Sequence, residues 1–205
     1  MEIDPKQLAH RDFYRILINA VAPRPIAWVS TVSAEGQPNV APFSFFNVVS
    51  AQPPLLGFSP APRVLEAGQV AKDTLRNVRE TREFVVNIVT YELAHAMNLT
   101  AGEYGPEVNE FELAGITMRA SQAVRAPQVA ESPVSFECKL ERVLDFGDDP
   151  HSGHFVIGEI VHVHVADELM TSGKMDGQAM ELIGRMGGLW YSRTRDRFEI
   201  ARPKL

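Results

Sequence analysis

The chain has 205 residues, of which 45% are apolar, and a formal net charge of −6. This length fits one globular domain with a sizeable core, residues 1–205, and the acidic balance argues against nucleic-acid binding, which recruits Lys and Arg to neutralise phosphates. The apolar runs are too short to span a membrane, no signal-peptide pattern is present, and the single cysteine, Cys138, excludes an internal disulfide. We therefore expect one cytoplasmic domain without a membrane segment.

Extended segments separated by turns fill the first half of the chain. They are dense in β-favouring residues and are bounded by turn residues or by prolines, which interrupt a central strand. The strands predicted from this pattern cover residues 26–32, 38–49 as one long strand or a bent pair, 55–59 and 84–89. Between the last two, Asp73 or Thr74 can cap a helix whose one side carries Leu75, Val78 and the stem of Arg82.

Short helical patterns and turns mix over residues 91–115, and two long strands follow. In residues 134–143, apolar side chains such as Cys138 alternate with polar ones, which predicts one core face and one outer face. In residues 154–166, one face is apolar apart from Glu159, and the other carries three histidines. Several strands with few, short helices indicate a mainly β fold with peripheral helices, a closed or split β-barrel.

Groups suited to a phosphate and to a polar linker gather in the first third of the chain. Lys72 stands just before the predicted helix start, where free backbone N–H groups attract anions, and Thr74 adds a hydroxyl. A solvated, capped helix start is the competing interpretation of this segment. Polar residues also lie where a purely structural barrel could use apolar ones, namely at Ser30, Thr31, Asn39, Ser44 and Arg63. A polar wall of this kind suits the ribityl chain of a flavin.

Aromatic residues lie beside these polar groups in the sequence. Trp28, Phe45 and Phe46 are candidates to bound an isoalloxazine ring, whose flat apolar faces reward stacking. Plain core packing is the competing interpretation, and for Trp28 and Phe43 it is the one we prefer. The combination therefore favours a flavin mononucleotide site.

Taken together, these residues resemble the FMN-binding split-barrel family, in its flavin reductase-like or flavoprotein-oxygenase branch. The resemblance covers about residues 16–87 and returns at 132–138, 158–160 and 184–193. It implies a split β-barrel with FMN at a homodimer interface, and it implies no catalytic residue besides the flavin chemistry. Carried over by position, the residues that it implies for FMN binding are Ser30, Thr31, Asn39, Ala41, Ser44, Phe45, Phe46, Arg63, Lys72, Thr74 and Tyr191.

The same resemblance implies an oxidoreductase that passes hydride or electrons from NAD(P)H through FMN to a flavin or a small acceptor. The chain has no Gly-x-Gly-x-x-Gly after a strand, so the nicotinamide donor is expected to dock transiently over the flavin. A non-catalytic FMN-binding electron carrier or sensor is the alternative. A third possibility is a barrel that binds another ligand or only protein.

Three further features receive structural interpretations. Four histidines suggest a metal site, but no clear fourth ligand accompanies those that share a strand face. We therefore expect the histidines on a solvated face or at the rim of a substrate cleft. These are His151, His154, His162 and His164. Glu159 is expected to pair internally or to meet the dimer partner, because an unpaired buried carboxylate is costly. Cys138 is expected to be an inert core thiol.

Overall fold

Strands dominate the computed structural model, which describes residues 1–60, 63–65, 68–70, 72–105, 107–149 and 152–203, with only the backbone path at 63–65 and 68–70. The main sheet contains β1 (Ala27–Val32), β2 (Pro38–Phe43), β3 (Phe46–Ala51), β4 (Pro54–Phe58), β7 (Glu83–Ile88), β10 (Val134–Asp145) and β11 (His154–Val165). Short hairpins are formed by β5 (Arg63–Leu65) with β6 (Gly68–Val70), β8 (Met118–Arg119) with β9 (Gln128–Val129), β12 (Met170–Thr171) with β13 (Lys174–Met175), and β14 (Ile183–Arg185) with β15 (Tyr191–Arg193).

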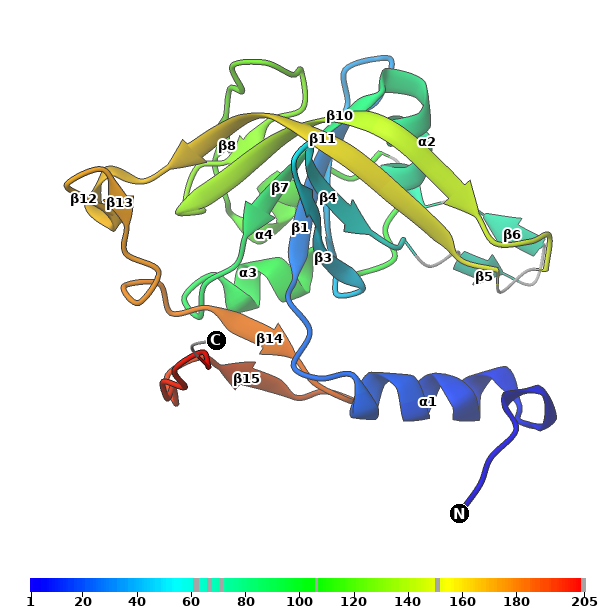
Figure 1. Cartoon of the computed structure of the whole chain (residues 1–205). Helices are drawn as coiled ribbons and strands as arrows, with labels where there is room; N and C mark the ends of the chain where they lie inside the picture. The colour runs from blue at the N-terminus through cyan, green and yellow to red at the C-terminus, as the bar shows by residue number, and fades with distance from the viewer. Residues whose placement is uncertain (61–62, 66–67, 71, 106, 150–151, 204–205) are drawn as a thin grey trace.

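Short helices surround these strands. They are α1 (His10–Ala20), α2 (Asp73–Thr81), α3 (Ala94–Leu99) and α4 (Glu110–Ala114), with 3-10 turns η1 (Pro5–Gln7) and η2 (Asp167–Leu169). The expectation of a mainly β fold with peripheral helices is confirmed (Figure 1). No helix within the described ranges is both long and apolar enough to cross a membrane.

The main sheet closes into a barrel because of one short connection. Its strand order is β2-β1-β7-β10-β11-β4-β3, so β2 and β3 stand at opposite ends of the order. Only Ser44 and Phe45 separate these two strands in the sequence. A two-residue connection can join the two edges only if the sheet curls until they meet. The segment 38–49 is therefore the bent strand pair that the sequence left as one of two possibilities.

The barrel interior is packed with apolar side chains from every side of the curled sheet. Phe58, Phe84 and Val156 are buried there, and Leu75 and Val78 of α2 close one end. Gly158 permits this packing, because a Cβ at that position would lie 2.4 Å from Cζ of Phe84. The predicted apolar side of the helix is thus its barrel-facing side.

A second core lies between the outer face of the sheet and the helices α3 and α4. Trp28 and Val40 pack there against Met97 and Phe111, and Trp28 has no exposed surface. The indole nitrogen of Trp28 donates a hydrogen bond to Oγ1 of Thr100 at 2.8 Å. The core interpretation of Trp28 is therefore confirmed, and this side chain does not bound a ligand ring.

The outer face of β10 differs from the prediction. Ser135 and Glu137 were expected to face outward, yet both are fully buried. The segment leading into β9 covers that face, and the Glu137 carboxylate accepts hydrogen bonds from the backbone N–H groups of Gln122 at 2.9 Å and Ala123 at 2.6 Å. The alternation of apolar and polar residues along β10 correctly assigned the side chains to two faces. It does not indicate whether another segment of the chain covers the polar face.

The two faces of β11 are also reversed relative to the prediction. Val156 and Gly158, which share a face with the histidines, point into the barrel, whereas Glu159 and Val161 are exposed. Glu159 is therefore not the buried carboxylate that we expected, and its contact with a dimer partner stays a prediction. The histidine-bearing face of β11 was expected to face outward because the residues at its two ends are polar. Its residues nearest the barrel centre are small or apolar, and they point inward.

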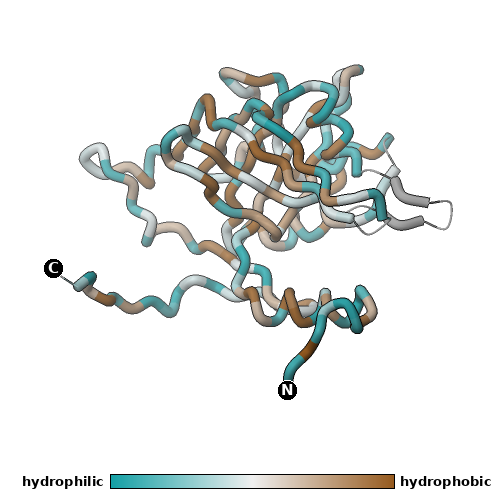
Figure 2. The backbone as a smooth tube through the Cα atoms, turned by 45° about the vertical axis from the view of Figure 1, so that its right-hand side comes forward, coloured by the Kyte–Doolittle hydropathy of each residue, from teal (hydrophilic) through white to brown (hydrophobic). Residues whose placement is uncertain are grey.

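The helix α1 and the hairpin β14–β15 lie together on one side of the barrel (Figures 1 and 2). The sequence analysis made no prediction for α1, none of whose residues is buried in the single chain. Arg24 holds the two segments together: its Nη1 donates to the carbonyls of Ile18 and Val21, both at 2.7 Å, and its Nη2 donates to the carbonyl of Met186 at 3.0 Å. A buried guanidinium thus satisfies the free carbonyls at the end of α1.

We predict that Cys138→Ser lowers the free energy of unfolding by about 1–3 kcal/mol. Cys138 has no exposed surface, its Sγ donates only a long contact of 3.6 Å to the Phe136 carbonyl, and burial raises the pKa of the thiol. A hydroxyl in the same place loses more hydration than the thiol did. Urea unfolding measures the change, with Cys138→Ala reporting the volume effect alone. Unchanged stability would show that the position is not a packed core site.

Candidate functional site

Two adjoining pockets form one groove along the outer side of β2, and we call it the β2 groove. They share Pro42 and Ala101. The first pocket is further lined by Asn39, Ala41, Lys72, Asp73, Thr74, Thr100, Gly102 and Glu110. The second, with a volume of about 150 Å³, is further lined by Ile26, Ser44, Met97, Asn98, Arg185 and Tyr191. The groove therefore runs from the start of α2 to the hairpin β14–β15.

A larger, mostly apolar pocket of about 390 Å³ continues from the groove at Ser44. We call it the Phe45 pocket. It lies where the two sheet edges meet, and it is lined by Leu17, Val21, Pro23, Arg24, Pro25, Ser44, Phe45, Phe46 and Asn47. Phe45 remains 40% exposed in the single chain, so a flat ligand can reach its ring.

Most of the residues predicted for flavin binding are brought together in these two places. Six line the β2 groove, and Phe45 and Phe46 line the Phe45 pocket. The six are Asn39, Ala41, Ser44, Lys72, Thr74 and Tyr191. Arg63 begins β5, and its side chain lies outside the described part of the structure.

Ser30 and Thr31 lie behind the groove and have no exposed surface. The Ser30 hydroxyl donates to the carbonyl of Pro127 and accepts from Nδ2 of Asn87 at 3.1 Å. Thr31 accepts from Nδ2 of Asn77 at 3.0 Å. Both hydroxyls thus bond to protein groups, and their effect on a ligand would be exerted through neighbouring side chains.

The start of α2 differs from the predicted cap. Lys72 occupies the N-cap position without a side-chain capping bond, while Asp73 forms an ion pair of 2.5 Å with Arg76 one turn later. The Thr74 hydroxyl instead donates to Oδ1 of Asn39 at 2.9 Å. Thr74 thus bonds to β2 and does not cap its own helix, and the first turn of α2, which has no side-chain cap, lies beside the groove.

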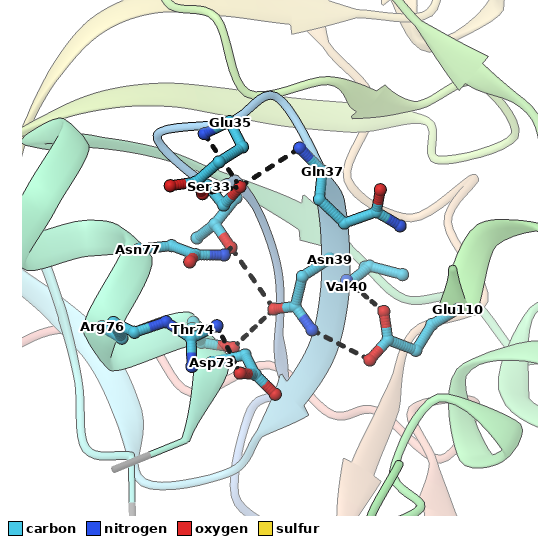
Figure 3. Close-up of polar contacts among 11 residues, drawn as sticks. Ser33, Glu35, Gln37, Asn39, Val40, Asp73, Thr74, Arg76, Asn77 and Glu110 are labelled. Carbon is cyan, nitrogen blue, oxygen red and sulfur yellow. Dashed lines mark hydrogen bonds and ion pairs between the residues drawn. The ribbon is translucent and has the colours of Figure 1, made fainter. Parts of the chain in front are cut away.

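Asn39 is the centre of a buried polar network beneath the Lys72 end of the groove (Figure 3). Its Oδ1 accepts from Thr31 and Thr74, and its Nδ2 donates to Oε1 of Glu110 at 2.9 Å. The other oxygen of Glu110 accepts a longer contact of 3.4 Å from the Val40 backbone. Burial raises the pKa of Glu110, because the charged form loses its hydration.

The other end of the groove combines a cation with an aromatic ring. The guanidinium carbon of Arg185 lies 4.6 Å from the centre of the Tyr191 ring, and the Tyr191 hydroxyl donates to Oδ1 of Asn98 at 3.4 Å. Nε of Arg24 donates to Oγ of Ser44 at 3.4 Å. Planar cations and ring faces of this kind can hold the edge and face of a flat heterocycle.

Sequence reasoning missed several residues that line the groove or its adjoining pocket: Arg24, Asn98, Thr100, Glu110 and Arg185. Arg24 and Arg185 stand within the segments that carry the family resemblance, so their charge was a usable signal. The others come from the region of short helices, where no motif marks them.

His154, His162 and His164 are not among the residues that line the groove or the Phe45 pocket. Nδ1 of His154 is 2.5 Å from Oδ1 of Asp145, His162 is exposed on β11, and His151 lies outside the described residues. Of the two positions expected for the histidines, the solvated face holds for His162, whereas the rim of a cleft is not supported for His154, because neither cavity lining includes it. Within the described part of the chain, no group of three or more His, Cys, Asp or Glu residues is arranged to hold a metal ion.

The barrel has the architecture of the flavin reductase-like proteins, as comparison with known proteins shows. Residues 20–195 match the flavin reductase like domain, and the chain belongs to this family. The structure is similar to nitrilotriacetate monooxygenase component B from Bacillus cereus, with a TM-score of 0.91 and 36% identity over 98% of each chain. This membership supports a flavin-related oxidoreductase activity.

Two further solved structures extend the comparison. The 2-nitrobenzoate 2-nitroreductase of Pseudomonas fluorescens has a TM-score of 0.87 and 31% identity, over 99% of this chain and 96% of that one. A split-barrel protein assigned to the flavin reductases, from Shewanella frigidimarina, has a TM-score of 0.80 and 23% identity over 99% of this chain and 100% of that one. The expected split β-barrel of the flavin reductase type is thereby confirmed.

We predict that wild-type protein loses stability relative to Glu110→Gln as the pH rises from about 4 to 7. Because burial raises the folded-state pKa of Glu110 above its unfolded value, its contribution to stability is present below the unfolded pKa and is lost as the pH rises through the folded pKa. Urea unfolding of both proteins at several pH values measures the difference. Glu112→Gln is the control, since it removes the same charge at an exposed position of the same helix. A pH-independent difference would contradict the assignment.

Proposed function

We propose that this protein is an FMN-dependent oxidoreductase that passes hydride or electrons from NAD(P)H, through FMN, to a flavin or a small acceptor. One observation carries the proposal: a single groove connects a lysine and a helix start at one end with an arginine–tyrosine pair at the other, and it opens into an aromatic pocket. These three parts match the phosphate, the polar linker and the flat ring of FMN in chemistry and in order.

The phosphate would lie at the start of α2. Lys72 supplies a charge there, the first-turn N–H groups are free of a side-chain cap, and Thr74 lines the same pocket. The nearby carboxylates do not prevent this, because Asp73 is paired with Arg76 and burial favours the uncharged form of Glu110. The charges and donors of the described residues at this end therefore suit a phosphate group.

The ring would lie towards Ser44, Tyr191 and Phe45. Bound FMN would supply the hydride and electron chemistry there, and the protein would bind and orient it. Arg185 and Arg24 place positive charge near this end, which favours a reduced, negatively charged flavin. The apolar walls of the Phe45 pocket would restrict water around the ring and leave room for a donor or acceptor to dock transiently.

A homodimer would complete this site. The single chain exposes apolar side chains on α1 and on the strands β3 and β11, and apolar surfaces of this kind commonly mark protein interfaces. They include Tyr14, Ile16, Leu17, Val48, Val49, Val161 and Val163. Leu17 also lines the Phe45 pocket, so a second copy that covers α1 would enclose the ring end of the groove.

The similarity to a monooxygenase component and to a nitroreductase supports chemistry on a small acceptor. The test is to load the protein with FMN, mix it anaerobically with NADH and then NADPH, and follow bleaching of the flavin band. We expect reduction by at least one donor, with modest donor affinity because the chain has no dinucleotide-binding motif. Reduction by dithionite alone would instead indicate an electron carrier or sensor.

We predict that Lys72→Ala weakens FMN binding roughly tenfold to a hundredfold, while riboflavin binding changes little. A charge-assisted contact to the phosphate is worth about 1.5–3 kcal/mol, and riboflavin has no phosphate to lose. Fluorescence titration with both ligands measures the two affinities. Lys139→Ala, at an exposed position of β10, is the matched control. Equal losses for FMN and riboflavin would remove Lys72 from the phosphate site.

A further inference from the structure

The lining of the Phe45 pocket suits a flat ligand without a positive charge. Its walls are mostly apolar and include the rings of Phe45 and Phe46 and two prolines, Pro23 and Pro25. Among the described residues that line it, Arg24 is the one charged group. Ring faces reward stacking by another flat ring. The pocket is therefore matched to an aromatic molecule.

The size of the pocket narrows this class further. Its volume of about 390 Å³ is near the lower end of the range for small-molecule pockets, roughly 300–1,000 Å³. On the proposed function, on which this step rests, the FMN ring approaches the pocket at Ser44, which lines both the groove and the pocket. The ring would therefore take up part of the same space. What remains suits an acceptor smaller than a second flavin.

One wall of the Phe45 pocket comes from outside the barrel. Leu17 lies in α1, Val21 directly follows this helix, and both line the pocket. These two residues are 37% and 60% exposed in the single chain, so neither is fixed by burial in a core. The ring of Tyr14, in the same helix, lies with its centre 6.3 Å from that of Phe45. The width of the pocket therefore depends on where α1 lies against the barrel.

Arg24 connects α1 to the rest of the site. Its backbone pairs with that of Arg185 in β14, with N to O distances of 2.9 and 2.8 Å. Its buried guanidinium donates to the carbonyls of Ile18 and Val21 at the end of α1, both at 2.7 Å. Nε of the same side chain donates to Oγ of Ser44 at 3.4 Å. One residue thus ties the helix, the hairpin β14–β15 and the joint between the sheet edges together (Figure 1).

We propose that α1, positioned by Arg24, is the size-selecting wall of the acceptor site, and that the acceptor is a flat aromatic molecule smaller than a flavin, such as a quinone. Leu17 and Val21 limit the width of the molecule that enters. Arg24 is a positioning residue, because it acts through the helix. The overall reaction balances: NAD(P)H gives up a hydride, the solvent gives up a proton, and the quinone gains both and becomes a hydroquinone.

The first test is an NMR titration of the full chain with indole, a flat aromatic probe, following the methyl groups of Leu17 and Val21. We expect a saturable shift with indole and much weaker binding of cyclohexanol, which is not flat. Neither flavin nor nicotinamide is added, so the outcome does not depend on whether NAD(P)H reduces bound FMN. No saturable shift at these methyl groups, or equal affinity for the two probes, would overturn the proposal.

A variant of Leu17 tests whether α1 forms the wall. Leu17→Trp fills the pocket and should weaken indole binding roughly tenfold, which corresponds to the loss of a modest amount of contact energy. Arg11→Trp introduces the same side chain at an exposed position of the same helix, outside the pocket lining, and is the control. Equal indole affinity in Leu17→Trp and in the wild type would remove α1 from the wall.

Acceptor selectivity tests the role of Arg24. In FMN-loaded protein, the ratio of kcat/KM for menadione to kcat/KM for riboflavin should fall several-fold in Leu17→Ala, because a wider pocket admits the flavin. Arg24→Met should lower the ratio in the same way and speed amide hydrogen exchange in α1, and Arg24→Lys should restore part of both. If Arg24→Met does not fold, Leu17→Ala carries the test. An unchanged ratio in Leu17→Ala would overturn the proposal.

Discussion

The two-residue connection between β2 and β3 is the constraint on which the rest of the structure depends. These strands occupy opposite edges of a seven-stranded sheet, and Ser44 and Phe45 alone join them. Closure of the barrel follows from this connection, and so does the position of the candidate site, because the joint places Ser44 in both the β2 groove and the Phe45 pocket. The fold and the binding surface therefore share one physical cause.

Beneath the groove, a buried hydrogen-bond network holds the polar floor in place. Glu110 orients Asn39, Asn39 orients Thr31, and Thr31 orients Asn77. The Asn39 amide thereby meets the hydroxyl of Thr74, which lines the groove. Buried polar networks of this kind specify geometry because any unpaired member is costly.

The sequence predicted the elements whose signal is local. Strands were recognisable from β-branched and aromatic residues between turns, and α2 from the apolar pair Leu75 and Val78. Predictions that depended on distant segments were less successful. The cap of α2 was wrong because Thr74 bonds to Asn39 on β2, and the outer face of β10 was wrong because another segment buries Glu137.

By itself, the sequence determined the fold class, the family resemblance and six of the residues that line the groove. The fold class follows from composition and periodicity, which are properties of neighbouring residues along the chain, whereas the set of site residues is what the family resemblance implies. Only the tertiary structure decided that Ser30 and Thr31 lie behind the groove and that Arg185 joins Tyr191 at its far end. The physical reason is that burial and hydrogen bonding depend on which distant segments come into contact. Closure of the barrel determines those contacts.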